Sequence, residues 1–448
     1  MREHLPEGTR ALPVADVVGE LATALGNHTK AVLIAPPGAG KTTAVPLVLR
    51  HAKWMPRDGK IIILEPRRLA ARAAARRMAD LIGEDVGATI GLRMRMETRI
   101  SHETRIEVVT EGVFSRMILD DPSLEGIACV IFDEFHERSL DADFGLALAL
   151  EAQGALRNDL RLLVMSATLD GAKVAGLLGG QSEAPVIESM GRAYPVDLVH
   201  WPRKPDERLE PAVVRAVHRA LKEYDGSVLV FLPGRAEIER VAAQLHSVQS
   251  EAVFVAPLFG AMDMRDQAKA VAPPAPGQRK IVLATSIAQT SITIDGVRVV
   301  IDTGLSREAV FEPAHAITRL ETVRVSQATA DQRAGRAGRT EPGIAIRLWH
   351  EGQTRSLRPH DVPEILRTDL SRFYLDALAW GARNPSDLPL LDAPPPGALA
   401  EARKRLQTLG LCDEKLGLTT QGASVRAIAL PVALAASVSC AQTREDAT

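Results

Sequence analysis

Hydrophobic residues in the first two-thirds of the chain recur in short β-branched runs, each followed by small or polar residues and then by a helical stretch. This order is typical of parallel strands joined by crossover helices. A first series of expected strands covers residues 31–34, 61–64, 107–109, 129–132 and 162–165. A second series covers 227–231, 252–255, 280–283, 297–301 and 344–348. The pattern predicts an α/β fold with two similar, mainly parallel sheets flanked by helices.

The pattern changes near residue 362, where helical periodicity replaces the β signal. The apolar positions that carry this period are Ile365, Leu366, Leu370, Phe373, Leu375 and Leu378. We expect a small, largely helical third unit there. The stretch 271–278 is rich in proline and is interpreted as a surface loop. The uncharged stretch 427–440 is shorter than the ~20 residues that span a bilayer, and we interpret it as a packed helix.

Composition adds general limits to this picture. The chain has 448 residues, of which 46% are hydrophobic and 25% charged, and these values are ordinary for a globular protein of two or three domains. The net charge of −2 gives no overall positive field, so nucleic-acid binding would depend on local patches. The three cysteines suggest no disulfide framework and the N-terminus no signal peptide, so we expect a cytoplasmic protein without a membrane partner.

A glycine-rich segment with the sequence APPGAGKT occupies residues 35–42, between an expected strand and a helical stretch. Glycines at 38 and 40 would let backbone N–H groups approach phosphate oxygens. A turn without a ligand is the alternative, but the strand, turn and helix order favours a P-loop. We expect ATP and Mg²⁺ here, with Lys41 reaching the β- and γ-phosphates and Thr42 binding the metal. The expected nucleotide-binding residues are Pro37, Gly38, Ala39, Gly40, Lys41, Thr42 and Thr43.

Two carboxylates, Asp133 and Glu134, follow the apolar run 129–132 directly. They are therefore expected at the carboxyl end of a strand, where open parallel sheets bind ligands. We expect Asp133 to hold Mg²⁺ through water and Glu134 to accept a proton from the attacking water. A solvated acidic turn is the alternative, which the nearby P-loop disfavours.

The segment 332–339, QRAGRAGR, interleaves three arginines with small residues. Its spacing predicts cations along one side of a helix start, and an ordinary solvated basic helix is the alternative. By analogy with other P-loop NTPases, we expect Arg336 and Arg339 to enter the γ-phosphate site from the second domain and Gln332 to orient water. Such arginines raise turnover by about 10³–10⁵, or ~4–7 kcal/mol. Hydrolysis would then depend on closure of the two domains.

Taken in order, these motifs resemble superfamily 2 DExH helicases of the DEAH/RHA group, and the bacterial HrpB-type ATP-dependent helicases in particular. The resemblance covers about residues 15–425. Its further motifs are EPRRLAAR at 65–72, TEG at 110–112, DEFHER at 133–138, SAT at 166–168, FLPG at 231–234, ATSIAQTS at 284–291 and TIDG at 293–296.

The resemblance implies two tandem RecA-like domains, 1–190 and 191–355, with ATP between them and single-stranded nucleic acid across both. It implies backbone contacts to nucleic acid that are tolerant of sequence and sensitive to salt. The matching residues are Arg67, Arg68, Thr110 and Gly112 in the first domain and Gly234, Thr285 and Ser291 in the second. A solvated helix face is the alternative for the arginines.

The resemblance also implies roles in coupling. Ser166 and Thr168 match a motif that links nucleotide state to strand separation, and Asp295 falls in a motif associated with the nucleotide. His136 is expected to couple the domains, and a structural histidine is the alternative. The segment 310–325 resembles a β-hairpin that wedges between strands, although a plain sheet-edge hairpin has the same pattern.

Several features depart from the family. Ser286 and Gln289 replace the common Asn and Glu, so we expect different fine contacts in that loop. Val271 stands where many members stack the adenine on an aromatic ring, so we expect other nucleoside triphosphates to be used as well as ATP. The resemblance implies a winged-helix-like unit at 356–425, and residues 426–448 are expected to start a helical domain that the printed sequence does not complete.

The sequence thus predicts a monomeric ATP-dependent helicase or translocase that acts on RNA, with RNA favoured over DNA by resemblance alone. One alternative is a nucleic-acid-stimulated ATPase that remodels ribonucleoprotein without processive unwinding. A binding module that uses ATP only as a latch would not need Glu134, Gln332 and the arginines. A metabolite kinase would have no role for the second sheet.

Overall fold

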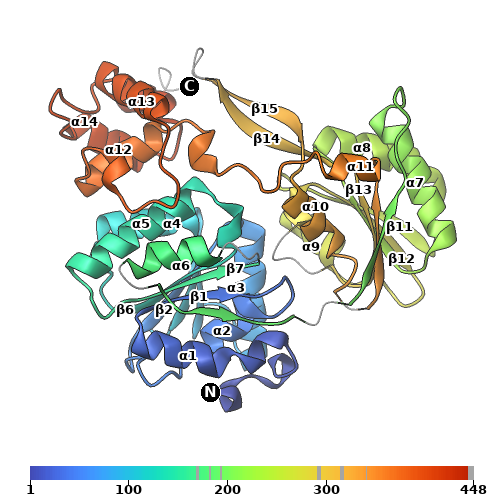
Figure 1. Ribbon diagram of the computed structural model, residues 1–448, viewed down its shortest axis with the longest axis horizontal. Helices are drawn as coiled ribbons and strands as arrows, with labels where there is room; N and C mark the ends of the chain where they lie inside the picture. The colour runs from blue at the N-terminus through green and yellow to red at the C-terminus, as the bar shows by residue number, and fades with distance from the viewer. Residues whose placement is uncertain are drawn as a thin grey trace.

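The structure is a computed structural model that describes residues 1–167, 171–180, 183–191, 194–289, 294–312, 317–339 and 341–441. Two sheets, each flanked by helices, form two lobes, and a group of helices from the C-terminal part of the chain lies against the first lobe (Figure 1). This arrangement confirms the fold class that the sequence predicts.

The first sheet has eight strands in the order β4-β3-β5-β2-β6-β7-β1-β8. Neighbouring strands are parallel except at one edge, where β3 and β4 are antiparallel. The five strands expected in this part are present, whereas β3, β4 and β8 were not expected. Polar residues interrupt β3 and β4, and β8 has only three residues, so their hydrophobic signal is weak. The strands are β1 Lys30–Ile34, β2 Lys60–Glu65, β3 Ile90–Met94, β4 Glu97–Arg99, β5 Ile106–Thr110, β6 Ile127–Phe132, β7 Arg161–Ser166 and β8 Val186–Glu188.

The second sheet is entirely parallel, with the order β11-β12-β10-β13-β16-β9. Its five expected strands are present, although β11 runs three residues further than expected, and the edge strand β9 was not expected. The strands are β9 Val196–His200, β10 Ser227–Phe231, β11 Val253–Leu258, β12 Arg279–Ala284, β13 Val297–Asp302 and β16 Gly343–Arg347. The expected hairpin is also present, as antiparallel β14 Leu305–Glu312 and β15 Ile317–Arg324. Its Pro313 and Ala314 lie outside the described residues.

Helices cover both faces of each sheet because both faces are apolar. In β1, Val32 and Ile34 pack into one core while Ala31 and Leu33 pack into another. This alternation is the two-residue period of a strand that is buried on both sides. The helices of the two lobes are α1 Val18–Asn27, α2 Lys41–Leu49, α3 Arg68–Ile82, α4 Glu111–Asp120, α5 Leu140–Ala155, α6 Gly171–Gly179, α7 Leu209–Glu223, α8 Arg235–Gln244, α9 Met264–Val271, α10 Gln327–Ala334 and α11 Glu351–Thr354.

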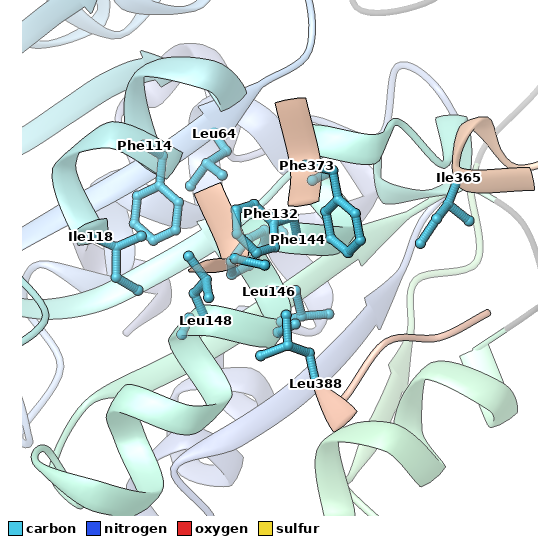
Figure 2. Packing of buried hydrophobic residues seen from close by; sticks show 14 of the residues in the cluster. Leu64, Phe114, Ile118, Phe132, Phe144, Leu146, Leu148, Ile365, Phe373 and Leu388 are labelled. Carbon is cyan, nitrogen blue, oxygen red and sulfur yellow. The ribbon is translucent and has the colours of Figure 1, made fainter. Parts of the chain in front are cut away.

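The C-terminal helices share a continuous core with the first lobe. Phe373 of α12 meets Phe144 of α5 edge to face, with ring centroids 5.1 Å apart, and Leu388 lies in the same cluster (Figure 2). Val432, Ala435 and Ala436 pack into this core too, so α15 is part of the same unit. The helices are α12 Ser371–Trp380, α13 Pro396–Thr408, α14 Thr420–Ala427 and α15 Val432–Cys440. These helices are therefore fixed to the first lobe.

The helical period that the sequence shows from residue 362 gives a regular helix only from Ser371. Pro363 precedes a short 3₁₀ turn, Glu364–Leu366, and the Asp369 carboxylate then accepts hydrogen bonds from the backbone and hydroxyl of Ser371. An aspartate two residues ahead satisfies a donor at the helix start, so the helix begins there.

The hairpin of the second lobe reaches toward the C-terminal helices (Figure 1). Arg367 pairs with Glu308 at 3.4 Å and donates a hydrogen bond to the Ala309 carbonyl. The Arg405 guanidinium lies 5.5 Å from the Phe311 ring centroid. The hairpin therefore braces the second lobe against the helical unit.

Within the described part of the chain, no single helix is long and apolar enough to cross a membrane. Helices α14 and α15 reach that length and composition only as a pair, and the chain bends by 111° between them.

Candidate nucleotide site between the two lobes

The expected P-loop forms a tight turn from β1 into α2. Gly38 and Gly40 have φ angles of 85° and 89°, in the region that favours glycine. A Cβ on Gly40 would lie 2.5 Å from the Leu12 side chain, which would have to move to make room for it. Helix α2 begins at Lys41, and its free N–H groups therefore face the turn. This geometry is that of an anion site.

Lys41 and Glu134 form a buried ion pair at the centre of the site. Lys41 Nζ lies 3.0 Å from Glu134 Oε1, and each side chain is 4% exposed. Burial alone would raise the pKa of Glu134, but Lys41, His136 and Arg336 outweigh it and lower that pKa to about 2. Burial would likewise lower the pKa of Lys41, but Glu134 and Asp133 raise it. Both groups therefore stay charged.

Thr42 and Asp133 lie next to this pair. The Thr42 hydroxyl donates to Asp133 Oδ2, and the backbone N–H of Glu134 donates to Asp133 Oδ1 at 2.8 Å. Burial raises the pKa of Asp133 to about 6, although Lys41 opposes this shift. The costly charge on Asp133 would be stabilised by a cation at this position.

These two oxygen donors fit Mg²⁺, which prefers one or two carboxylates together with phosphate oxygens and water. Among the described residues, no group of three or more His, Cys, Asp or Glu side chains could hold a metal ion by itself. The donor set therefore suits a metal that arrives with a nucleotide.

Arg333 lies in the last turn of a helix and the other two arginines of residues 332–339 lie beyond its end, so the expected helix start was wrong. Helix α10 stops at Ala334, and Arg336 and Arg339 follow in a turn. A Cβ on Gly338 would lie 2.6 Å from the Tyr194 carbonyl oxygen, so only glycine lets this turn pack so closely. The local spacing of the motif carries no information about this contact.

The turn directs both arginines toward the first lobe. Arg336 is buried and Arg339 is half-buried, and burial lowers both pKa values, in Arg339 to about 10, while the Glu134 carboxylate opposes the shift in each. Arg336 Nε donates to the Gln289 carbonyl at 3.0 Å. Lys41 of one lobe and Arg336 of the other therefore act on the same carboxylate.

The first arginine of the motif has a different environment. Arg333 is fully buried, pairs with Asp302 at 2.7 Å and donates to the Leu305 carbonyl. Its guanidinium also lies 4.8 Å from the Phe231 ring centroid. Arg333 therefore stabilises the second lobe and does not face Glu134.

His136 joins the lobes directly. Its Nε2 lies 3.0 Å from Gln332 Nε2, and its Nδ1 lies 3.5 Å from Glu134 Oε2. The backbone N–H of Ala167, between Ser166 and Thr168, lies 3.3 Å from the same Nδ1. Ser166 is buried at the end of β7, and Thr168 lies outside the described residues.

The predicted nucleic-acid contacts of the first lobe lie at the carboxyl edge of its sheet. Arg67 bridges the lobes, since it donates to the Ser286 carbonyl and pairs with Glu137 at 3.0 Å. Arg68 and Gly112 are exposed, and Thr110 precedes α4 as its N-cap residue.

In the second lobe, Gly234 precedes α8 and Thr285 follows β12, while Ser291 lies outside the described residues. Asp295 is exposed, and its charge acts on Lys280, whose pKa it tends to raise. Its predicted nucleotide role therefore gains no support from a contact with the P-loop.

Three residues near the site carried no prediction of a role. Gln289 contacts Arg336 and Gln332, Thr329 contacts Gln289, and Glu65 lies buried at the end of β2. Burial, Asp133 and Glu134 together raise the pKa of Glu65 well above its usual value. In the sequence, Gln289 is marked only as a departure from the family and Glu65 only as the first residue of the motif at 65–72.

Comparison with known families and proteins agrees with this geometry. The DEAD/DEAH box helicase family matches residues 19–176, and the helicase conserved C-terminal domain matches residues 212–341. The chain is 47% identical over 437 residues to the ATP-dependent RNA helicase HrpB of Escherichia coli (strain K12). That match covers 98% of this chain and 53% of HrpB, so the chain spans about half the length of that relative.

More distant proteins and solved structures match as well. The probable ATP-dependent RNA helicase DHX34 of Homo sapiens is 34% identical over 437 residues, which cover 95% of this chain and 38% of DHX34. A crystal structure of the Escherichia coli DEAH/RHA helicase HrpB matches with a TM-score of 0.91 and 46% identity, over 98% of this chain and 55% of that chain. The chain therefore belongs to the DEAH/RHA-type helicases of superfamily 2.

Proposed function

We propose that this chain is an ATP-dependent RNA helicase that hydrolyses ATP between its two lobes while it holds single-stranded nucleic acid. The observation that carries the proposal is the convergence of Lys41, Glu134 and Arg336 from two separate lobes. The 47% identical relative HrpB is an ATP-dependent RNA helicase, which supports the same activity for this chain.

The ion pair between Lys41 and Glu134 suggests how substrate binding prepares the general base. A γ-phosphate would compete with Glu134 for Lys41, because both are anions. Loss of this cation would raise the pKa of Glu134 from its low value and make the carboxylate a better proton acceptor. Binding of ATP would thus release Glu134 from its ion pair with Lys41 and let it act as the base for the attacking water.

Thr42 and Asp133 would hold Mg²⁺ on the phosphate side of the site. When bound, the cation would neutralise charge on the phosphate oxygens. Asp133 also accepts the backbone N–H of Glu134, so it would orient the base as well.

The second lobe would complete the site. Arg336 and Arg339 would stabilise charge on the transferred phosphoryl group, and Gln332 would orient the water. Because Gln332 and Arg336 belong to a different lobe from Lys41, hydrolysis would depend on how the lobes approach each other.

Nucleic acid would lie across the carboxyl edges of both sheets, with Arg68, Thr110, Gly112, Gly234 and Thr285 as contacts. Backbone contacts of this kind position a strand and do not read its sequence. We propose that the chain acts in the cytoplasm, as a monomer, with RNA preferred over DNA. The valine at 271 would leave the adenine poorly distinguished, so rates with ATP and GTP would differ by less than about tenfold.

The test is the ATP hydrolysis rate of the chain alone, with single-stranded RNA and with single-stranded DNA of matched length. We expect stimulation by RNA and a smaller effect of DNA. Stimulation should weaken at high salt, since phosphate contacts are salt-sensitive. The Glu134→Gln variant is the control for contaminating activity. Equal rates with and without nucleic acid would refute the coupling, and a strand-displacement assay would separate a helicase from a remodelling ATPase.

A further inference from the structure

Gln289 contacts two of the groups that the second lobe brings to the nucleotide site. Its backbone carbonyl oxygen accepts a hydrogen bond from Arg336 Nε at 3.0 Å, and its side-chain Nε2 lies 2.9 Å from Gln332 Oε1. The residue is 9% exposed, so water does not compete freely for these contacts. One buried residue therefore holds both the arginine and the glutamine.

Contacts with Thr329 and, through it, Asp361 fix the orientation of the Gln289 carboxamide. Its Nε2 also lies 3.2 Å from Thr329 Oγ1, which lies 2.6 Å from Asp361 Oδ2. A carboxylate can only accept, so the Thr329 hydroxyl must donate to Asp361. The hydroxyl oxygen is then left to accept from Gln289, which must turn its NH₂ group toward both Thr329 and Gln332.

The orientation of Gln332 in turn determines which ring nitrogen of His136 carries the proton. Since Gln289 donates to the Gln332 carbonyl, the Gln332 NH₂ group faces His136 Nε2 at 3.0 Å. That ring nitrogen must accept, so a neutral His136 carries its proton on Nδ1. Nδ1–H then faces Glu134 Oε2 at 3.5 Å.

The contact between the Ala167 N–H and His136 Nδ1 needs the opposite tautomer. That N–H lies 3.3 Å from Nδ1 and could donate only if Nδ1 were unprotonated. The Gln332 NH₂ group would then face a second N–H at Nε2. The two tautomers thus exchange a bond to Gln332 for a bond to Ala167, and Gln289 decides which is favoured.

We propose that Gln289, backed by Thr329 and Asp361, is a positioning residue for ATP hydrolysis in this chain. It holds Arg336, sets the orientation of the Gln332 carboxamide and, through Gln332, selects the Nδ1–H tautomer of His136. The inference rests on the proposed function for its kinetic consequence but not for the tautomer. Three segments of the second half of the chain thereby act on the base of the first lobe.

The kinetic test replaces the relay residues without changing their size. Gln289→Met and Thr329→Val should lower kcat by about tenfold, the effect of losing one orienting hydrogen bond. KM for ATP should change less than about twofold, because Lys41 and Thr42 belong to the first lobe. Thr329→Ser keeps the hydroxyl and should restore kcat.

Gln327→Met is the matched control on the same helix. Its amide donates to the Leu357 carbonyl at 3.0 Å, so it ties α10 to the following segment without reaching Gln332. Wild-type kcat in Gln289→Met would overturn the proposal. So would an equal loss in Gln327→Met, or a Thr329→Ser variant as slow as Thr329→Val.

The tautomer test does not depend on activity. Ring ¹⁵N shifts of His136 in the protein without added nucleotide, assigned by comparison with His136→Asn, should report the Nδ1–H form. In Gln289→Glu the new carboxylate can only accept, so Gln332 should turn its NH₂ group toward residue 289 and His136 should move to the Nε2–H form. If His136 has the same tautomer in the wild type and in Gln289→Glu, the relay is overturned. If the tautomer changes but the wild-type chain does not hydrolyse ATP, only the proposed function is overturned.

Discussion

Replacing Arg336 with alanine should remove most of the hydrolysis and leave ATP binding nearly unchanged. The side chain belongs to the second lobe, is 4% exposed and acts electrostatically on Glu134 of the first lobe. The P-loop that would bind the phosphates belongs to the first lobe and leads directly into α2. Binding and cleavage should therefore separate in this variant.

The expected loss follows from the charge that Arg336 would place on the transferred phosphoryl group. An arginine in this position contributes about 10³–10⁵ in turnover, which corresponds to ~4–7 kcal/mol. We expect the lower end of this range, because Arg339 lies in the same turn and keeps one cation near Glu134. The expected loss in kcat is therefore about a thousandfold.

The assay is single-turnover hydrolysis at saturating ATP and RNA, together with equilibrium binding of a fluorescent ATP analogue. Arg336→Lys is the matched variant, since it keeps the charge and loses the planar fork, and it should recover only part of the rate. Thermal melting would show that the second lobe still folds. A loss below about tenfold, or an affinity loss as large as the rate loss, would refute the reasoning.

Three further predictions concern stability. Arg333→Ala should destabilise the second lobe by about 3–5 kcal/mol in urea unfolding, because it leaves Asp302 buried without its cation, and a loss below about 1 kcal/mol would contradict this. Phe373→Ala should lower the free energy of unfolding by about 3–5 kcal/mol and lower the melting temperature of the first lobe, because the two share one core. If only the C-terminal helices unfold earlier in this variant, their core is separate from that of the first lobe. Burial raises the pKa of Glu111 to about 8, although Ser139 opposes the shift, so the neutral form is favoured in the fold and stability falls as the pH rises from about 4.5 to about 8. Glu111→Gln should therefore raise the melting temperature more at about pH 9 than at about pH 5, and an equal change at both would contradict the assignment.

The parts that the sequence predicts correctly are those whose signal is local. The glycines at 38 and 40 sit within a few residues of the strand and helix that they connect, and the structure gives both a positive φ. Asp133 and Glu134 follow a continuous apolar strand in the same way. Their position at the carboxyl end of β6 follows from chain order alone.

The parts that the sequence does not predict depend on contacts between distant segments. The motif at 332–339 has the pattern of one basic element, yet Arg333 pairs with Asp302 in the core while Arg336 faces the other lobe. The turn after α10 includes the close approach of Gly338 to Tyr194, which belongs to a different segment. No local pattern specifies these partners.

The C-terminal helices show the same limit. Their apolar period predicts helices but not which surface they cover, and Phe373 packs against Phe144 of the first lobe, more than two hundred residues earlier in the chain. The relay through Gln289, Thr329 and Asp361 likewise joins three segments that only the fold brings together.

The central claim is that cleavage of ATP needs groups from both lobes in contact with the same phosphate. The most direct measurement is a crystal structure with ADP, aluminium fluoride, Mg²⁺ and single-stranded RNA, which mimics the transferred phosphoryl group. We predict that Lys41 Nζ leaves Glu134 for the fluoride group and that the Arg336 guanidinium lies within hydrogen-bond distance of the same group. A complex in which Lys41 holds the fluoride group while Arg336 stays remote from it would contradict the claim.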